Sequence, residues 1–208
     1  MNRSRRTFLK YTAALLLAAC GSGGKNQKLP DNAAILALGD SLTEGYGAAK
    51  GADYPTQLAE ITGRKLINGG VSGNTSAQAL ARLPALLRQQ PALVLVCIGG
   101  NDFLRRLPER ETRANIGKII ATVQKAGSSA VLVAVPHFTT GALFGNLSDH
   151  PMYRELAQQY RIPLLENVWS EILGDPDLKS DTIHANAEGY RQMAEETAAF
   201  LRGQGFLG

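Results

Sequence analysis

The sequence lacks the residue patterns that mark metal centres and phosphate-binding loops. None of its three histidines combines with cysteines or carboxylates at the spacing of metal ligands. The glycine pairs Gly69-Gly70 and Gly99-Gly100 are not followed by the Lys-Ser/Thr of a P-loop. We therefore expect the protein to use no metal and no cofactor.

Cysteine is scarce, with two residues in a chain of 208. Cys97 lies inside an apolar run, where we expect a small core residue rather than a reactive thiol. If Cys20 is acylated, as argued below, Cys97 is the one remaining thiol. No intramolecular disulfide is then possible.

Excess positive charge is confined to the N-terminus. Four of the 22 Lys and Arg residues lie in the first ten positions, which contain no Asp or Glu: Arg3, Arg5, Arg6 and Lys10. Without these four, the 22 basic residues fall to 18, which equals the 18 Asp and Glu residues. The pI near 9.2 therefore gives no support to nucleic-acid binding, which needs a cationic patch on the folded domain.

Residues 1–19 have the three parts of a secretory signal. A cationic start leads into an apolar run over 13–19, which is too short to span a bilayer. Residues 4–10 resemble a twin-arginine export signal. Residues 17–20 resemble the lipobox of bacterial lipoproteins, which implies that Cys20 is acylated and becomes the new N-terminus. The alternative is an ordinary buried first helix.

The remaining chain divides into a tether and one domain. Residues 20–33, rich in Gly, Lys, Asn and Pro, are typical of a flexible linker from a membrane to a domain, and 34–208 form the domain. Gly21 rather than Asp follows the cysteine, which by resemblance to enterobacterial sorting rules implies the outer membrane. We therefore expect a lipid-anchored protein of the cell envelope, with its domain on the periplasmic side or the surface.

Apolar runs alternate with helical patterns throughout the domain. This alternation predicts an α/β fold, a three-layer α/β/α sandwich around a flavodoxin-like parallel sheet of about five strands. The expected strands are 34–38, 65–68, 93–98, 130–135 and 162–165, and the expected helices are 54–62, 76–88, 112–126, 152–160 and 187–202.

Polar and small residues gather where these strands end. They occupy segments 39–43, 68–75 and 99–102, and a fourth segment, 181–184, is reached from the last strand through a loop. Ligands of such folds bind at the carboxyl ends of the strands. If the strands are parallel, all four segments meet at one edge of the sheet.

Within these segments, one serine and one histidine suit nucleophilic catalysis. A serine hydroxyl needs a base to take its proton, and imidazole titrates near the operating pH. Of the three histidines, His184 is the one with a carboxylate, Asp181, three residues before it. In a tight loop this spacing lets the carboxylate of Asp181 reach the Nδ1–H of His184 and fix the imidazole tautomer. The other ring nitrogen can then take the proton of Ser41. The alternatives are turn, helix-cap and surface-loop roles.

The same segments resemble the blocks of the SGNH (GDSL) hydrolase family. Gly39-Asp40-Ser41-Leu42 matches the nucleophile block, Gly73 and Asn101 match the next two blocks, and Asp181-x-x-His184 matches the catalytic pair. The resemblance covers residues 34 to about 202. It is nearest to the periplasmic thioesterase I/lysophospholipase L1 group, through residues 71–84.

This resemblance implies a role for each block. Ser41, Asp181 and His184 would be the catalytic residues. The backbone N–H groups of Ser41 and Gly73 and the side-chain amide of Asn101 would form the oxyanion hole. The family usually has proline after the histidine, whereas Ala185 stands here, which leaves that loop less rigid.

Two further carboxylates in these segments have a structural interpretation instead. We expect Asp40 and Asp102 to hold loops through hydrogen bonds from backbone N–H groups.

The substrate is less defined than the chemistry. The loop over 136–147 is long and mildly apolar, and Phe138, Leu143 and Phe144 are candidates to line an acyl groove, with a plain surface loop as the alternative. We expect a monomeric serine esterase that hydrolyses small-molecule esters such as lysophospholipids, aryl esters and acyl (thio)esters, with the membrane contacted through Cys20. The alternatives are a carbohydrate O-acetylesterase of the envelope and a non-catalytic lipid-binding lipoprotein.

Overall fold

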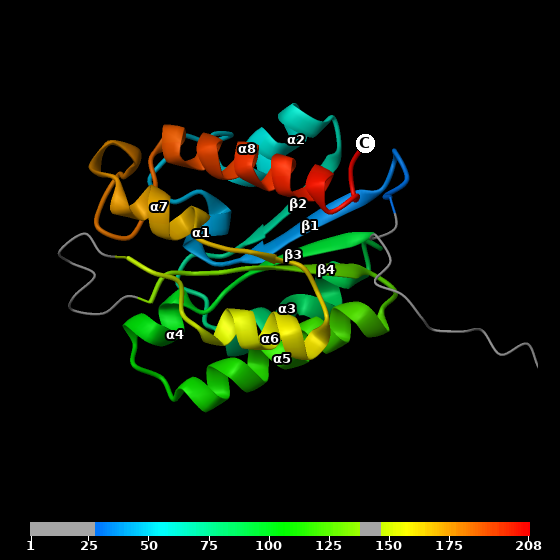
Figure 1. Ribbon diagram of the computed structural model, residues 1–208, viewed down its shortest axis with the longest axis horizontal. Helices are drawn as coiled ribbons and strands as arrows, with labels where there is room; N and C mark the ends of the chain where they lie inside the picture. Colours follow the sequence, from blue (N-terminus) through cyan, green and yellow to red (C-terminus); the bar gives the residue numbers. More distant parts are fainter. Residues whose placement is uncertain (1–27, 138–146) are drawn as a thin grey trace, which may run out of the picture.

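The computed structural model describes residues 28–137 and 147–208, and these form a three-layer α/β/α sandwich (Figure 1). Its centre is a parallel sheet of five strands in the order β2-β1-β3-β4-β5, which is the flavodoxin-like order. The fold class expected from the sequence is confirmed. The strands are β1 (Ala34–Gly39), β2 (Lys65–Gly70), β3 (Leu93–Cys97), β4 (Ser129–Val133) and β5 (Leu164–Leu165).

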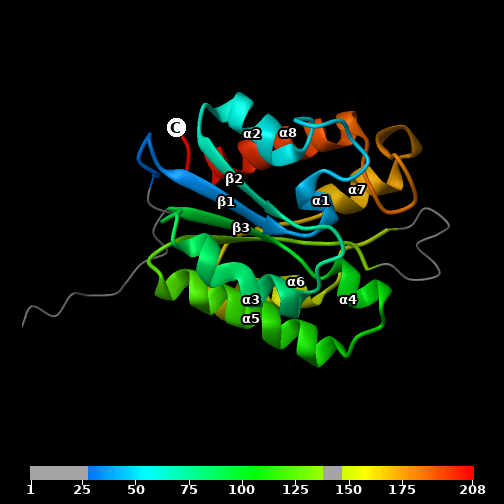
Figure 2. The ribbon, with the colours of Figure 1, turned by 180° about the vertical axis from the view of Figure 1, so that it is seen from behind.

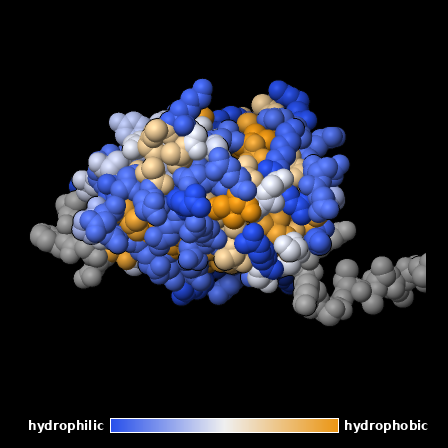
Figure 3. All heavy atoms as spheres, turned by 90° about the horizontal axis from the view of Figure 1, so that it is seen from above, coloured by the Kyte–Doolittle hydropathy of each residue, from blue (hydrophilic) through white to orange (hydrophobic). Residues whose placement is uncertain are grey.

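Helices cover both faces of the sheet (Figures 1 and 2). On one face lie α1 (Ser41–Glu44), α2 (Tyr54–Thr62), α7 (Val168–Gly174) and α8 (Ala187–Gly203). On the other lie α3 (Ser76–Leu87), α4 (Gly100–Leu104), α5 (Glu109–Lys125) and α6 (Met152–Tyr160). The outer face of the layer with α2 and α8 is mainly hydrophilic, with smaller hydrophobic patches between the polar residues (Figure 3).

The central strands β1 and β3 form because their residues are apolar on both sides. Every residue of β1 and β3 is buried, as a strand covered by helices on both faces requires. Cys97 ends β3 as a buried free thiol, and burial raises the pKa of that thiol well above its ordinary value. It is therefore part of the core, as expected.

Local signals place the helix ends. Thr75 and Gln78 form a capping box at the start of α3, in which each side chain bonds the other's backbone N–H. The side chain of Asn186 accepts a hydrogen bond from Gly189 N at the start of α8. The five long helices were predicted within three residues of these ends.

Short elements account for the differences from the expected pattern. The helices α1, α4 and α7 were not predicted, because helices of four to seven residues are too short for an amphipathic repeat to show. Strand β4 ends at Val133 rather than residue 135, since its partner β5 is only two residues long.

Only the last part of the N-terminal region, from residue 28, belongs to the described residues. The signal over 1–19 and Cys20 lie outside the described residues. The flexible tether was expected to reach residue 33, but Leu29 is buried and its N–H donates to the carbonyl of Phe206 at 3.0 Å. The last part of that segment is thus packed on the domain. In the described part of the chain, no helix combines the length and apolarity needed to cross a membrane.

Candidate active site

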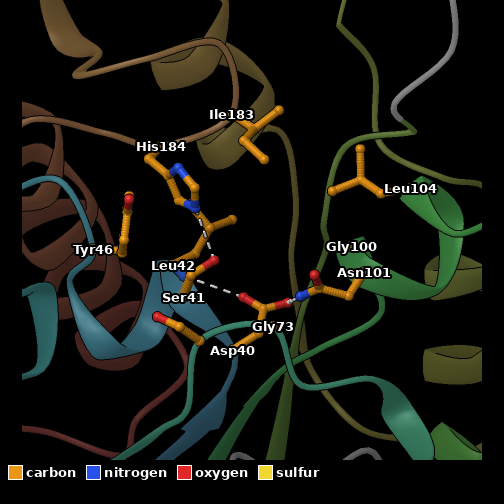
Figure 4. Close-up of a pocket in the computed structure, with 11 residues that line it drawn as sticks. Asp40, Ser41, Leu42, Tyr46, Gly73, Gly100, Asn101, Leu104, Ile183 and His184 are labelled. Atoms are coloured by element: carbon orange, nitrogen blue, oxygen red, sulfur yellow. Dashed lines mark hydrogen bonds between the residues drawn. The ribbon is translucent and has the colours of Figure 1, made fainter.

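Four of the sequence-predicted residues line one pocket at the carboxyl edge of the sheet. Ser41, Gly73, Asn101 and His184 come from four separate segments, and they surround a cavity of about 210 Å³ (Figure 4). The topology explains the convergence of Ser41, Gly73 and Asn101, because β1, β2 and β3 are parallel and deliver the segments that follow them to the same edge. His184 reaches this edge from the loop between α7 and α8.

Ser41 is the first residue of α1, directly after a tight turn at the end of β1. Gly39 is required in this turn, because a Cβ there would lie 2.6 Å from the carbonyl oxygen of Cys97. The Asp40 side chain accepts a hydrogen bond from Leu42 N at 3.1 Å and so caps α1. The nucleophile candidate is therefore held by close packing and a cap.

A hydrogen-bonded row links Ser41 to His184 and Asp181. His184 Nε2 lies 3.0 Å from Ser41 Oγ, and His184 Nδ1 lies 2.8 Å from Asp181 Oδ2. Partial burial raises the pKa of Asp181, but hydrogen bonds from Ile183 and His184 outweigh it, so the pKa falls below its ordinary value. The row has the geometry by which an imidazole can take a hydroxyl proton while a carboxylate orients it.

Three N–H donors face the pocket without being used up. The backbone N–H groups of Ser41 and Gly73 form no hydrogen bond with any residue of 28–137 or 147–208. Asn101 Nδ2 donates one hydrogen to Asp40 Oδ2 at 3.3 Å, and its second hydrogen has no acceptor within the described ranges. Gly73 has φ +76°, a conformation that favours glycine. Such donors are what an oxyanion hole needs.

The two aspartates expected to hold loops do so. Asp102 accepts hydrogen bonds from the backbone N–H of Ser76 at 2.8 Å, from its hydroxyl at 2.6 Å and from Thr112 Oγ1 at 3.2 Å. Asp40 is buried beneath Ser41, and burial raises its pKa from 3.8 to about 6 despite the bonds from Leu42 and Asn101.

The loop carrying His184 is closed by hydrogen bonds in place of the family's proline. Ser180 N donates to the carbonyl of His184, and Ser180 Oγ donates to the carbonyl of Ala185, both at 3.0 Å. Ala185 itself is fully buried. These contacts fix the loop on both sides of the histidine.

The apolar wall of the pocket was not predicted. Tyr46 packs its ring against His184 with centroids 4.5 Å apart, and Ile183 and Leu104 also line the cavity (Figure 4). No periodicity marks these residues, so only the high exposure of Tyr46 and Leu104 in the structure singles them out. The candidates Phe138, Leu143 and Phe144 lie outside the described residues.

The other two histidines lie apart from the row. His137 and His150 pack against each other with ring centroids 4.4 Å apart, and Phe103 stacks on His150. Burial and the neighbouring His137 lower the pKa of His150. Across the described ranges, no group of three or more His, Cys, Asp or Glu side chains is arranged to hold a metal ion.

Comparisons with known proteins identify the family of the chain. The sequence model of the GDSL-like lipase/acylhydrolase family matches residues 37–192. The chain is 34% identical to thioesterase 1/protease 1/lysophospholipase L1 of Escherichia coli K12, over 81% of this chain and 83% of that protein. It is 30% identical to an arylesterase of Vibrio mimicus, over 80% and 87% respectively.

A solved structure extends the likeness to three dimensions. The psychrotrophic esterase EstA from Pseudoalteromonas sp., inhibited by monoethylphosphonate, superposes with a TM-score of 0.71 at 27% identity. The match covers 83% of this chain and 98% of EstA.

Proposed function

The chain belongs to the GDSL-like lipase/acylhydrolase family and is a carboxylic ester hydrolase, and from this premise we propose that Ser41 is its nucleophile. His184 is the general base, and Asp181 orients it. The observation that carries the proposal is the 3.0 Å contact between His184 Nε2 and Ser41 Oγ, with Asp181 on the other ring nitrogen.

The proposed reaction proceeds in two halves. Ser41 Oγ attacks the ester carbonyl carbon while His184 Nε2 takes its proton, and the new oxyanion accepts hydrogen bonds from Ser41 N, Gly73 N and Asn101 Nδ2. The protonated His184 then gives its proton to the departing alcohol or thiol, which leaves an acyl-enzyme. Water, deprotonated by His184, releases the acid and restores the serine.

Removing the nucleophile tests this assignment. We expect Ser41→Ala to lower kcat on p-nitrophenyl butyrate by about 10⁴-fold or more while the circular dichroism spectrum and Tm stay unchanged. Substantial activity in clean Ser41→Ala protein would remove Ser41 from the mechanism.

We propose an acyl or aryl ester as the substrate class, including lysophospholipids and acyl thioesters. The apolar side chains of Tyr46, Leu104 and Ile183 at the pocket support this choice. The small cavity of about 210 Å³ favours a second candidate, an O-acetyl ester of a carbohydrate. Rates on p-nitrophenyl esters from acetyl to palmitoyl separate the two, because a sharp preference for acetyl would exclude the first.

We also propose that the protein is exported and anchored in the cell envelope through acylated Cys20. The support is the sequence of residues 1–20 alone. Cells fed labelled palmitate should label the wild-type protein and not Cys20→Ala. Undiminished labelling of Cys20→Ala would refute the anchor, and Cys97→Ala serves as the matched control.

A further inference from the structure

In the loop between β2 and α3, one backbone N–H has no partner among residues 28–137 and 147–208. Residues 71–74 contribute four backbone N–H groups, and three of them donate hydrogen bonds: Val71 N to Gly39 O at 3.2 Å, Ser72 N to Glu44 Oε2 at 2.6 Å, and Asn74 N to Val71 O at 3.1 Å. Gly73 N has no acceptor among the described residues. Its position beside Ser41 in the pocket makes it the donor available to a substrate.

Glu44 ties this loop to the helix of the nucleophile. It is the last residue of α1, three positions after Ser41. Its Oε2 accepts hydrogen bonds from both the backbone N–H and the hydroxyl of Ser72. These hydrogen bonds fix the Val71–Ser72 peptide group, the one before the Ser72–Gly73 peptide, relative to Ser41.

Arg105 ties the same loop to the helix of Asn101. It follows α4 directly, four positions after Asn101. Its Nη2 donates to the carbonyl oxygen of Gly73 at 2.8 Å. This contact fixes the Gly73–Asn74 peptide group, the one after the Ser72–Gly73 peptide, relative to Asn101.

We propose that Glu44 and Arg105 are positioning residues that together aim the Gly73 N–H at the oxyanion. The inference rests on the proposed serine esterase mechanism. A glycine peptide rotates at little cost, so the N–H of Gly73 would turn away from the pocket if its neighbours were not held. Glu44 and Arg105 bind the peptide groups on either side of the Ser72–Gly73 peptide. Because each peptide group is planar, the Ser72–Gly73 peptide between them keeps its orientation. The two side chains also hold Gly73 in register with Ser41 and Asn101, the other two donors.

The test uses the full chain with one loss variant and one retention variant for each side chain. Arg105→Met and Glu44→Met remove the hydrogen-bonding group and keep the aliphatic stem. Arg105→Lys and Glu44→Gln keep one donor or acceptor. Arg106→Met is the matched control, because Arg106 is an exposed neighbour whose guanidinium makes no hydrogen bond or ion pair with the described residues.

Three quantities are measured for each variant. They are kcat and KM on p-nitrophenyl butyrate, the Ki of an alkyl trifluoromethyl ketone, and Tm. The ketone reports on the oxyanion hole, since Ser41 adds to it and produces an oxyanion. Losing a whole oxyanion donor costs about 10²–10³-fold in rate, and misaiming one costs less, so we expect each Met variant to lower kcat about tenfold. Ki should rise by a similar factor, while KM and Tm stay close to wild type. The Lys and Gln variants should recover most of the rate, and Arg106→Met should equal wild type.

Two results would overturn the inference. One is wild-type kcat in both Met variants. The other is a loss of kcat that accompanies a lower Tm with Ki unchanged, which would make the contacts merely structural. Ser41→Ala is measured beside them: activity retained there defeats the proposed mechanism itself, whereas an inactive Ser41→Ala with fully active Met variants defeats the positioning role alone.

Discussion

Ser41 and His184 meet across one pocket, but the chain holds the two side chains by different means. Ser41 opens a helix whose next two residues, Leu42 and Thr43, are buried, and the turn before it has no room for a single added carbon. His184 lies in a loop of exposed and half-buried residues, held by its hydrogen bonds with Asp181 and Ser180. Packing positions Ser41, the proposed nucleophile, and local hydrogen bonds position His184, the proposed base.

From this difference we expect substitutions in the two regions to affect stability and activity differently. A change to the packed turn that carries Ser41, apart from loss of the Ser41 hydroxyl itself, disturbs the core and should lower stability more than activity. A change on the base side leaves the core intact and should cost activity before stability. The predictions below test this division, from the largest effect to the smallest.

Asp181→Asn should strike activity with little effect on folding. The amide cannot stabilise the imidazolium and allows the wrong tautomer, so kcat should fall by about 10²–10⁴-fold. Because Asp181 is on an exposed loop, Tm should stay within a few degrees of wild type. Steady-state kinetics and thermal melts on the same preparation check both statements. A large drop in Tm would break the comparison.

Gly39→Ala should do the opposite and unfold the protein more readily. The added Cβ would lie 2.6 Å from the backbone oxygen of Cys97, which cannot move without disturbing β3. We expect a loss of about 3 kcal/mol in the free energy of unfolding. Ser180→Ala is the counterpart on the base side: it removes one hydrogen bond and should cost about 1 kcal/mol. Urea unfolding measures both. Equal losses would contradict the division.

Asp40 makes the nucleophile side sensitive to pH. Its pKa rises from 3.8 to about 6 on folding, chiefly by burial, so the folded protein holds this proton more tightly than the unfolded chain. The stabilisation is complete below pH 3.8 and is lost as pH rises through 6, a change of about 3 kcal/mol at most.

Asp40→Asn removes this titration and serves as the reference. The free energy of unfolding of the wild type relative to Asp40→Asn should fall between pH 4 and pH 7, as measured by urea unfolding at each pH. A constant difference across that range would show that the carboxyl is not perturbed.

Ala185→Pro should give the smallest effect, a gain. The N–H of Ala185 donates to no described residue, so proline removes no hydrogen bond there. It also restricts the unfolded chain, and we expect about 0.4–1 kcal/mol of added stability with unchanged kcat. A calorimetric melt checks the sign. A lower Tm would mean that the buried site around Ala185 has no space for the ring.

The sequence predicts the framework well because the framework depends on repeating patterns. Buried strands such as Leu93–Cys97 read as apolar runs between turn residues, and amphipathic helices such as Ala187–Gly203 read as a stripe with a cap before it. Three of the site segments were found for a related reason, since those of Ser41, Gly73 and Asn101 each follow a strand whose direction the alternation implies. The segment of His184 follows α7 and was found from the spacing of Asp181 and His184 instead.

Sequence patterns could not predict the side chains that hold the site loops in place. Glu44 contacts the loop of Gly73 from the four-residue helix α1, and Arg105 contacts it from the position directly after the five-residue helix α4. No periodicity announces such short helices, and no spacing in the chain relates Arg105 to a glycine 32 residues earlier. These contacts exist only once the sheet has brought the loops together.

The most direct test of the account is to label the nucleophile. Purified protein is treated with diisopropyl fluorophosphate, digested, and analysed by peptide mass spectrometry. If Ser41 is the nucleophile and His184 its base, we expect a single adduct, on Ser41, and complete loss of hydrolysis. The adduct should form far more slowly in His184→Ala. Loss of activity with the adduct on another residue, or full labelling of Ser41 in His184→Ala at the wild-type rate, would contradict it.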